Sequence, residues 1–143
     1  MNVLDILTQT TKEEASDLFI VAGRPLSYKK NGKILQAGEE RMMPHDCETF
    51  VREIYELAGK RDISRFLATG DDDFSFAVQG LSRYRVSTYR QRGSLSAVIR
   101  VITFELPDPS ALGIPDPIIR LADQKKGLIL VTGPAGSEIG RAS

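Results

Sequence analysis

Three runs of alternating residues between Asp73 and Thr103 constrain the fold of this chain most. They are rich in β-branched and aromatic residues, which is typical of strands that bury only one face. The inward positions are Phe74, Phe76 and Val78, then Tyr84, Val86 and Thr88, then Leu95, Ala97, Ile99 and Val101. The pattern predicts antiparallel strands, with a turn at Arg92-Gly93 between the second and third runs.

That turn has a consequence for two arginines. If its loop has two residues, Arg85 lies directly opposite Arg100 in the sheet. Because like charges directly opposite destabilise a sheet, the pair suggests an anion site, and guanidinium forks suit phosphate oxygens. The alternative is that both arginines are solvated or pair with the acidic run Asp71–Asp73.

Composition narrows the functional class. Hydrophobic residues make up 41% and charged residues 27% of 143 residues, which is typical of one globular domain. Lys plus Arg and Asp plus Glu number 19 each, so no overall charge favours nucleic acid or a membrane surface. Apolar runs fall short of the roughly 20 residues that span a bilayer, and no signal peptide begins the chain. We expect a cytoplasmic protein with no transmembrane segment.

The N-terminal third predicts a helix followed by short strands. Residues 2–15 have the spacing of an amphipathic helix, and Leu18–Val21 form an apolar run typical of a buried strand. Asn31-Gly32 predicts a type I′ hairpin turn between strands at 26–30 and 33–36.

Helices are predicted between those strands and the alternating runs. Pro44 opens a helix with one apolar stripe, and residues 61–68 add a second helical piece before Thr69-Gly70 and the acidic run end the pattern. The stripe consists of Cys47, Phe50, Val51, Ile54 and Leu57. Cys47, the single cysteine, suits a reducing compartment and a buried position. His45, the single histidine, is predicted to lie on the surface.

A stiff segment and an incomplete phosphate loop follow Thr103. Pro107, Pro109, Pro115 and Pro117 indicate a connection, with a short helix starting at Asp116-Pro117. Leu128–Val131 predicts a strand buried on both faces, and Gly133 fits the first glycine of a GxxxxGK[ST] phosphate loop.

The second half of that loop departs from its pattern. Positions 138, 139 and 140 call for Gly, Lys and Ser or Thr, and carry Glu138, Ile139 and Gly140. We interpret the chain as ending inside the phosphate loop, with residues 138–143 a foreign tail. Without the lysine and magnesium ligands, this chain by itself is expected not to hydrolyse ATP.

The chain resembles a known family through six segments in order: ASDLFIVAG, KKNGKI, DFSF, RYRVSTYRQRG, AVIRVI and GLILVTGPAGS. Together they resemble PilT-type pilus-retraction (twitching motility) ATPases of the secretion ATPase superfamily. One departure is Phe19, where the family often has histidine. The resemblance covers the chain to Ser137.

The resemblance implies an α+β fold in three parts. Residues 1–105 would form a PAS-like antiparallel sheet with helices mainly on one face. Residues 106–126 would be a proline-rich linker with a short helix. Residues 127–143 would begin a truncated RecA-like ATPase domain with its first strand.

The resemblance also implies a nucleotide site. Arg85 and Arg100 match two family arginines that reach the terminal phosphate, while Arg83 and Arg92 are weaker candidates. Gly133, Gly136 and Ser137 match the start of the phosphate loop. ATP and magnesium would be cofactors of the full-length protein, and no cofactor or metal is expected on this chain alone.

Partners follow from the same resemblance, with two alternatives. The full-length protein would be a homohexamer that works on the pilus base machinery, peripheral to the inner membrane. A PAS-like ligand-sensing or protein-interaction module without an ATPase role is the alternative. Nucleic-acid binding through the arginine-rich hairpin, with Tyr84 and Tyr89 stacking on bases, is disfavoured by the zero net charge.

Overall fold

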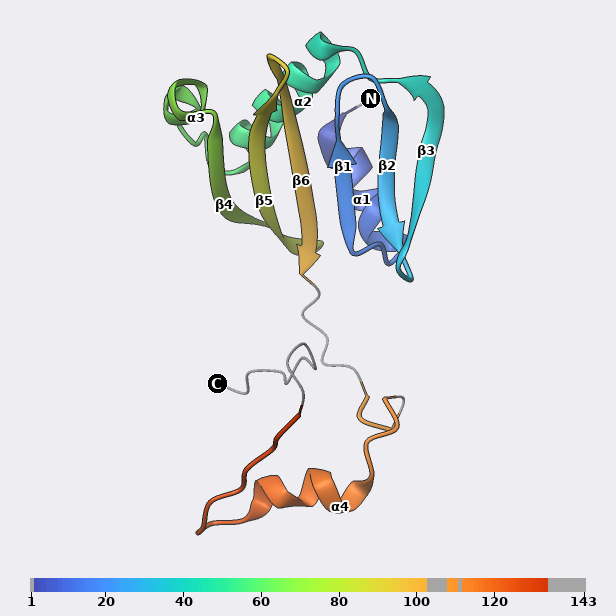
Figure 1. Cartoon of the computed structure of the whole chain (residues 1–143), viewed down its shortest axis with the longest axis vertical. Helices are drawn as coiled ribbons and strands as arrows, with labels where there is room; N and C mark the ends of the chain where they lie inside the picture. The colour runs from blue at the N-terminus through green and yellow to red at the C-terminus, as the bar shows by residue number, and fades with distance from the viewer. Residues whose placement is uncertain (1, 103–107, 111, 134–143) are drawn as a thin grey trace. The chain divides into compact units, whose positions relative to one another are not determined.

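A computed structural model of the chain describes residues 2–102, 108–110 and 112–133. The chain divides into two units, residues 1–104 and 105–143, and each is described by itself. The first unit is a six-stranded sheet with the strand order β3-β2-β1-β6-β5-β4 (Figure 1). Every neighbouring pair of strands is antiparallel.

The elements of the first unit follow the sequence pattern closely. The helices are α1 (Val3–Lys12), α2 (Pro44–Leu57) and α3 (Ser64–Thr69). Figure 1 shows α1 and α2 on the same side of the sheet. The predicted α+β sheet with helices mainly on one face is therefore confirmed. The strands are β1 (Asp17–Ile20), β2 (Pro25–Lys30), β3 (Lys33–Arg41), β4 (Asp71–Val78), β5 (Ser82–Gln91) and β6 (Ser94–Ile102).

The core lies between the helices and one face of the sheet. Alternation along β5 buries Tyr84, Val86 and Thr88 and exposes the residues between them. On α2 the predicted stripe packs inward, and Cys47 is fully buried as expected. Burying a large apolar side chain stabilises by about 1.5–3 kcal/mol, so this one face carries most of the stability. Further core residues are Leu7, Leu18, Ile20, Val51, Ile54, Phe66, Ala97 and Ile99.

Two tight turns fix the register of the hairpins. Asn31 and Gly32 have φ of 50° and 76°, and Arg92 and Gly93 have φ of 50° and 82°. Positive φ at both central positions is the requirement of a type I′ turn, whose twist matches that of the strands. Both turn predictions are confirmed. The second turn sets the pairing of β5 with β6 that places Arg85 opposite Arg100.

Two strands extend beyond the sequence prediction. β3 continues from the expected end at residue 36 to Arg41, because its pairing with β2 resumes at Pro25–Arg41 after an irregularity. β4 begins inside the acidic run, which we expected to separate the elements. Asp72 can occupy an inward position there because its carboxylate accepts hydrogen bonds from Tyr55 and Arg61.

The second unit contains short helices and an extended apolar stretch. α4 (Asp116–Ile119) continues into a 3₁₀ turn, η1 (Arg120–Asp123). The strand predicted at Leu128–Val131 is not formed: these residues have no regular secondary structure and are 47–82% exposed. A strand requires a hydrogen-bonded neighbour, and among the described residues no strand pairs with this stretch.

Candidate functional site

Arg85 and Arg100 are brought together on the sheet face that points away from α1 and α2. They are direct register partners on β5 and β6, as the sequence predicts. Tyr84, Val86 and Ile99 beside them are buried against the helices. Because side chains alternate along a strand, both guanidinium groups project from the opposite face, where their side chains are 62% and 69% exposed.

Each arginine has its own carboxylate. Nε and Nη2 of Arg85 donate to Oδ1 and Oδ2 of Asp73 at 3.2 and 3.0 Å. Nε of Arg100 donates to Oδ1 of Asp17 at 3.2 Å. The hydrogen bonds that Arg85 donates to the Asp73 carboxylate raise the pKa of Arg85, so this guanidinium stays charged. The two carboxylates offset the repulsion expected of two facing arginines.

The alternative that these arginines pair with the acidic run Asp71–Asp73 is therefore correct for Arg85, which pairs with Asp73. It is wrong for Arg100, which pairs with Asp17. Sequence reasoning missed Asp17, whose side chain is only 11% exposed. Asp17 is the register partner of Arg100 on one side and of Lys29 on the other. The only sequence signal is its position at the start of the predicted strand, and the pairing of β1 with β6 is needed to connect it to Arg100.

These residues form one row across four strands: Lys29, Asp17, Arg100 and Arg85 on β2, β1, β6 and β5. We call it the cross-strand charge row. The Arg85–Asp73 pair is exposed on both sides, and such a pair contributes only about 0–1 kcal/mol, so the guanidinium groups can also donate to an anion that lies beside their carboxylates. The row is suited to receive an anionic ligand.

The other predicted site residues are more dispersed. Arg83 lies two residues before Arg85, on the same face of β5, opposite Ile102. Arg92 lies in the turn that joins β5 to β6. Gly133 is exposed in the second unit, and Gly136 and Ser137 lie outside the described residues.

Other kinds of site find little support in the described ranges. No group of three or more His, Cys, Asp or Glu side chains could hold a metal ion within them. His45 is exposed beside Asp46, with Nε2 3.0 Å from Oδ1, as predicted for a surface histidine. Burial raises the pKa of Cys47, so its thiol stays protonated and unreactive. Over the same described ranges, no helix is long and apolar enough to cross a membrane.

Comparison with known proteins relates the chain to pilus ATPases. It is 31% identical over 137 residues to the type IV pilus retractation ATPase PilT of Pseudomonas aeruginosa. It is 30% identical over 132 residues to the type IV pilus ATPase PilU of the same organism. These alignments cover 96% and 92% of the chain. No protein-family model matches.

Solved structures agree with this relationship. A crystal structure of the pilus retraction motor PilT with bound ADP matches with a TM-score of 0.72 and 34% identity over 96% of the chain. The ATPase DotB of Legionella pneumophila shares the fold, with a TM-score of 0.69 and 24% identity over 94% of the chain. The chain spans 39% and 34% of the lengths of the PilT and PilU relatives, and 39% and 38% of these two structures.

Proposed function

Because this chain corresponds to the N-terminal part of PilT-type secretion ATPases, we propose that it serves as the N-terminal domain of an ATP-hydrolysing motor that drives type IV pilus retraction. The relationship supports this role, since a PilT relative is described as a retraction motor and was crystallised with ADP. The single observation on this chain that carries the proposal is the facing pair Arg85 and Arg100.

The pair has the chemistry to contact a terminal phosphate. A guanidinium has five N–H donors, of which Arg85 uses two on Asp73 and Arg100 one on Asp17. Among the described residues no other partner is found for the remaining donors, so they can bind phosphate oxygens without loss of these ion pairs. In phosphoryl transfer, positioning and stabilisation of developing negative charge supply most of the catalysis.

The carboxylates act on the arginines as positioning residues. Asp17 and Asp73 hold the two guanidinium groups on one face, so their rotamers are restricted before an anion arrives. Mg-ATP, bound by the ATPase domain of the full-length protein, would supply the phosphoanhydride bond. Gly133, Gly136 and Ser137 would belong to the loop that cradles its phosphates, with backbone N–H groups as donors.

We propose further that the full-length protein assembles with copies of itself. The full-length protein would be a homohexamer, peripheral to the inner membrane on its cytoplasmic side, and would act on the pilus base machinery. In such a ring the exposed sheet face with the cross-strand charge row would meet a neighbouring subunit. We propose no nucleic-acid partner for this protein.

The test uses a chain that continues into a complete ATPase domain. We expect Arg85→Ala and Arg100→Ala each to lower kcat for ATP hydrolysis about 10²-fold or more while the hexamer remains intact, as for a lost transition-state charge donor. Arg52→Ala is the matched control, because Arg52 is exposed on α2 and, within the part of the chain that the structure describes, forms its ion pair with Glu48 one helical turn away. Unchanged hydrolysis in both strand variants, with intact hexamers, would overturn the role of the pair.

A further inference from the structure

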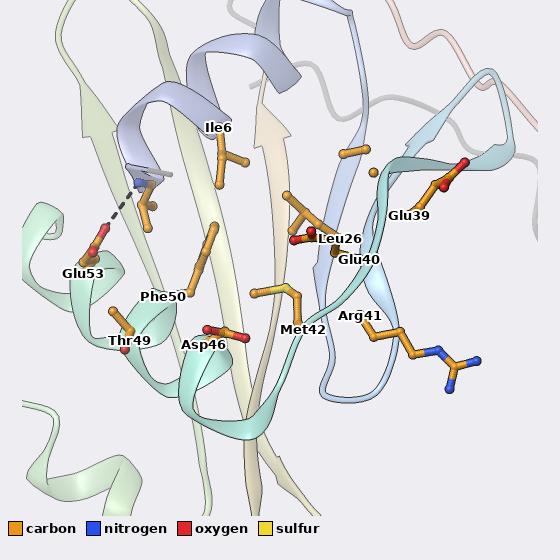
Figure 2. Close-up of a pocket in the computed structure, with 13 residues that line it drawn as sticks. Ile6, Leu26, Glu39, Glu40, Arg41, Met42, Asp46, Thr49, Phe50 and Glu53 are labelled. Atoms are coloured by element: carbon orange, nitrogen blue, oxygen red, sulfur yellow. Dashed lines mark hydrogen bonds between the residues drawn. The ribbon is translucent and has the colours of Figure 1, made fainter.

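A groove lies on the opposite side of the sheet from the cross-strand charge row, between α1, α2 and β3 (Figure 2). Its volume is about 560 Å³, within the range of typical ligand sites. The floor is apolar and combines Ile6 of α1, Leu26 of β2, Phe50 of α2 and Met42, which follows β3. The sequence gives no signal for this groove, because its walls come from four separate segments.

The rim of the groove is acidic. Glu39 and Glu40 of β3 and Asp46 and Glu53 of α2 line it, while Arg41 is the one basic residue among the lining side chains. Figure 2 shows Glu39 and Arg41 both directed away from the apolar floor, whereas Glu40 is directed toward Leu26. The carboxylates of Glu40, Asp46 and Glu53 therefore lie beside the concave apolar surface and concentrate negative potential there. The groove is therefore complementary to a cationic, partly apolar ligand.

One wall of the groove is an irregular edge strand. β3 is one of the two edge strands of the sheet, and its pairing with β2 jumps from Ser27–Gln36 to Pro25–Arg41. Residues 37–40 have no register partner on β2, and they all line the groove. An edge strand with unpaired backbone groups is a surface to which another extended chain can add.

We propose that this groove binds an extended peptide segment of a partner protein in which apolar side chains alternate with lysine or arginine. The apolar side chains would pack on the floor formed by Ile6, Leu26 and Phe50. The cationic side chains would meet the carboxylate of Glu40, with those of Asp46 and Glu53 on the opposite wall. Alternation suits the site because side chains of an extended strand point to opposite sides at successive residues.

This inference is separate from the proposed motor function. The groove contains neither Arg85 nor Arg100, and peptide binding there requires no nucleotide. The sign of the rim also distinguishes the partner, since an anionic lipid or nucleic-acid surface would be repelled by the carboxylates of Glu40, Asp46 and Glu53. A basic and apolar peptide is the ligand class that matches both the floor and the rim.

The test measures fluorescence anisotropy of a labelled six-residue peptide in which lysine alternates with leucine, titrated with the 143-residue chain. We expect saturable binding that weakens as salt rises. The variant Glu40→Lys should weaken it about tenfold or more, because like charges across an interface are costly. Ala37→Trp, at an exposed position that lines the groove, should block it.

The matched control is Glu56→Lys, which makes the same charge change at an exposed position of α2 outside this groove. It should leave affinity within about twofold, consistent with a screened distant charge. Circular dichroism establishes that each variant is folded. No saturable binding, equal binding of a peptide with glutamate in place of lysine, or full affinity in the Glu40→Lys variant would each overturn the proposal.

Discussion

At the scale of single residues, Asp72 shows how an acidic side chain is accommodated in the sheet. Its side chain is 6% exposed. Nε and Nη2 of Arg61 donate to its two oxygens at 3.0 and 3.1 Å, and the Tyr55 hydroxyl donates to Oδ2 at 3.0 Å. Arg61 also lies over the Phe74 ring, with Cζ 4.8 Å from the ring centre. This cluster connects α2 to the start of β4.

We predict that Asp72→Asn lowers the free energy of unfolding by about 1–3 kcal/mol, because Arg61 and Tyr55 lose a charged acceptor. Arg61 lowers the pKa of Asp72, so the contribution is fully present above the unfolded-state value of about 3.9. It is lost as pH falls through the lower folded-state pKa. Urea unfolding at several pH values should show the difference from wild type shrinking as pH falls below about 4.

The matched control for Asp72→Asn is Asp71→Asn, the exposed neighbour on the same strand. It should change stability by less than about 0.5 kcal/mol, as most surface substitutions do. A difference between Asp72→Asn and wild type that stays constant from pH 7 to pH 2 would contradict the ion-pair account.

The neighbours of Arg100 in the sheet show which residue pairs the sequence can predict and which it cannot. The opposition of Arg85 and Arg100 is predictable, because it depends only on the alternation of two adjacent strands and a two-residue turn. The pairing of Arg100 with Asp17 is not, because β1 and β6 are distant in the chain. The length of a turn determines which residues of a hairpin face each other, whereas the order of the hairpins in a sheet depends on the packing of the whole core.

At the scale of elements, the β5–β6 turn combines a favourable and an unfavourable residue. Gly93 at φ 82° is free of strain, but Arg92 at φ 50° is in the left-handed region without glycine's freedom. Asn-Gly, which the chain uses at Asn31-Gly32, suits this turn type better. A residue pair that ends in glycine predicted both hairpin turns. Arg92-Gly93, although less favourable than Asn-Gly, adopts the same geometry because the pairing of β5 with β6 holds the turn in place.

We predict that Arg92→Asn raises the free energy of unfolding by about 0.5–1 kcal/mol, through relief of left-handed strain. Gly93→Ala should lower it by about 1 kcal/mol or more, because a Cβ is disfavoured at that positive φ. Thermal and urea unfolding measure both changes. Two variants that shift stability in the same direction would contradict a type I′ turn here.

Elements also differ in how well their ends are predicted. α2 begins at Pro44 as the sequence indicates, since Asp46 accepts a hydrogen bond from the Met43 N–H at 2.8 Å. The extension of β3 to Arg41 escapes prediction, because Ala37–Glu40 lack an alternating pattern and the strand is completed by renewed pairing at its end. The groove beside β3 cannot be predicted from the sequence either, because its walls come from four separate segments.

At the scale of the whole molecule, the core belongs to the first unit alone. Every residue of the described hydrophobic core lies between Val3 and Ile99. In the second unit, Leu128, Leu130 and Val131 are 82%, 76% and 67% exposed. The stretch has the apolar character of a strand from the middle of a parallel sheet, but among the described residues no strand pairs with it.

We therefore predict that residues 1–104 fold independently, with a melting temperature within about 4 °C of the 143-residue chain, since no described core contact is removed. The longer chain should self-associate more strongly with concentration, because a contiguous exposed apolar run favours association. Calorimetry and sedimentation velocity test the two parts. Leu130→Lys in the longer chain is the matched variant and should reduce association without changing the melting temperature. A large loss of stability on truncation would mean that residues 105–143 contribute to the fold of the first unit.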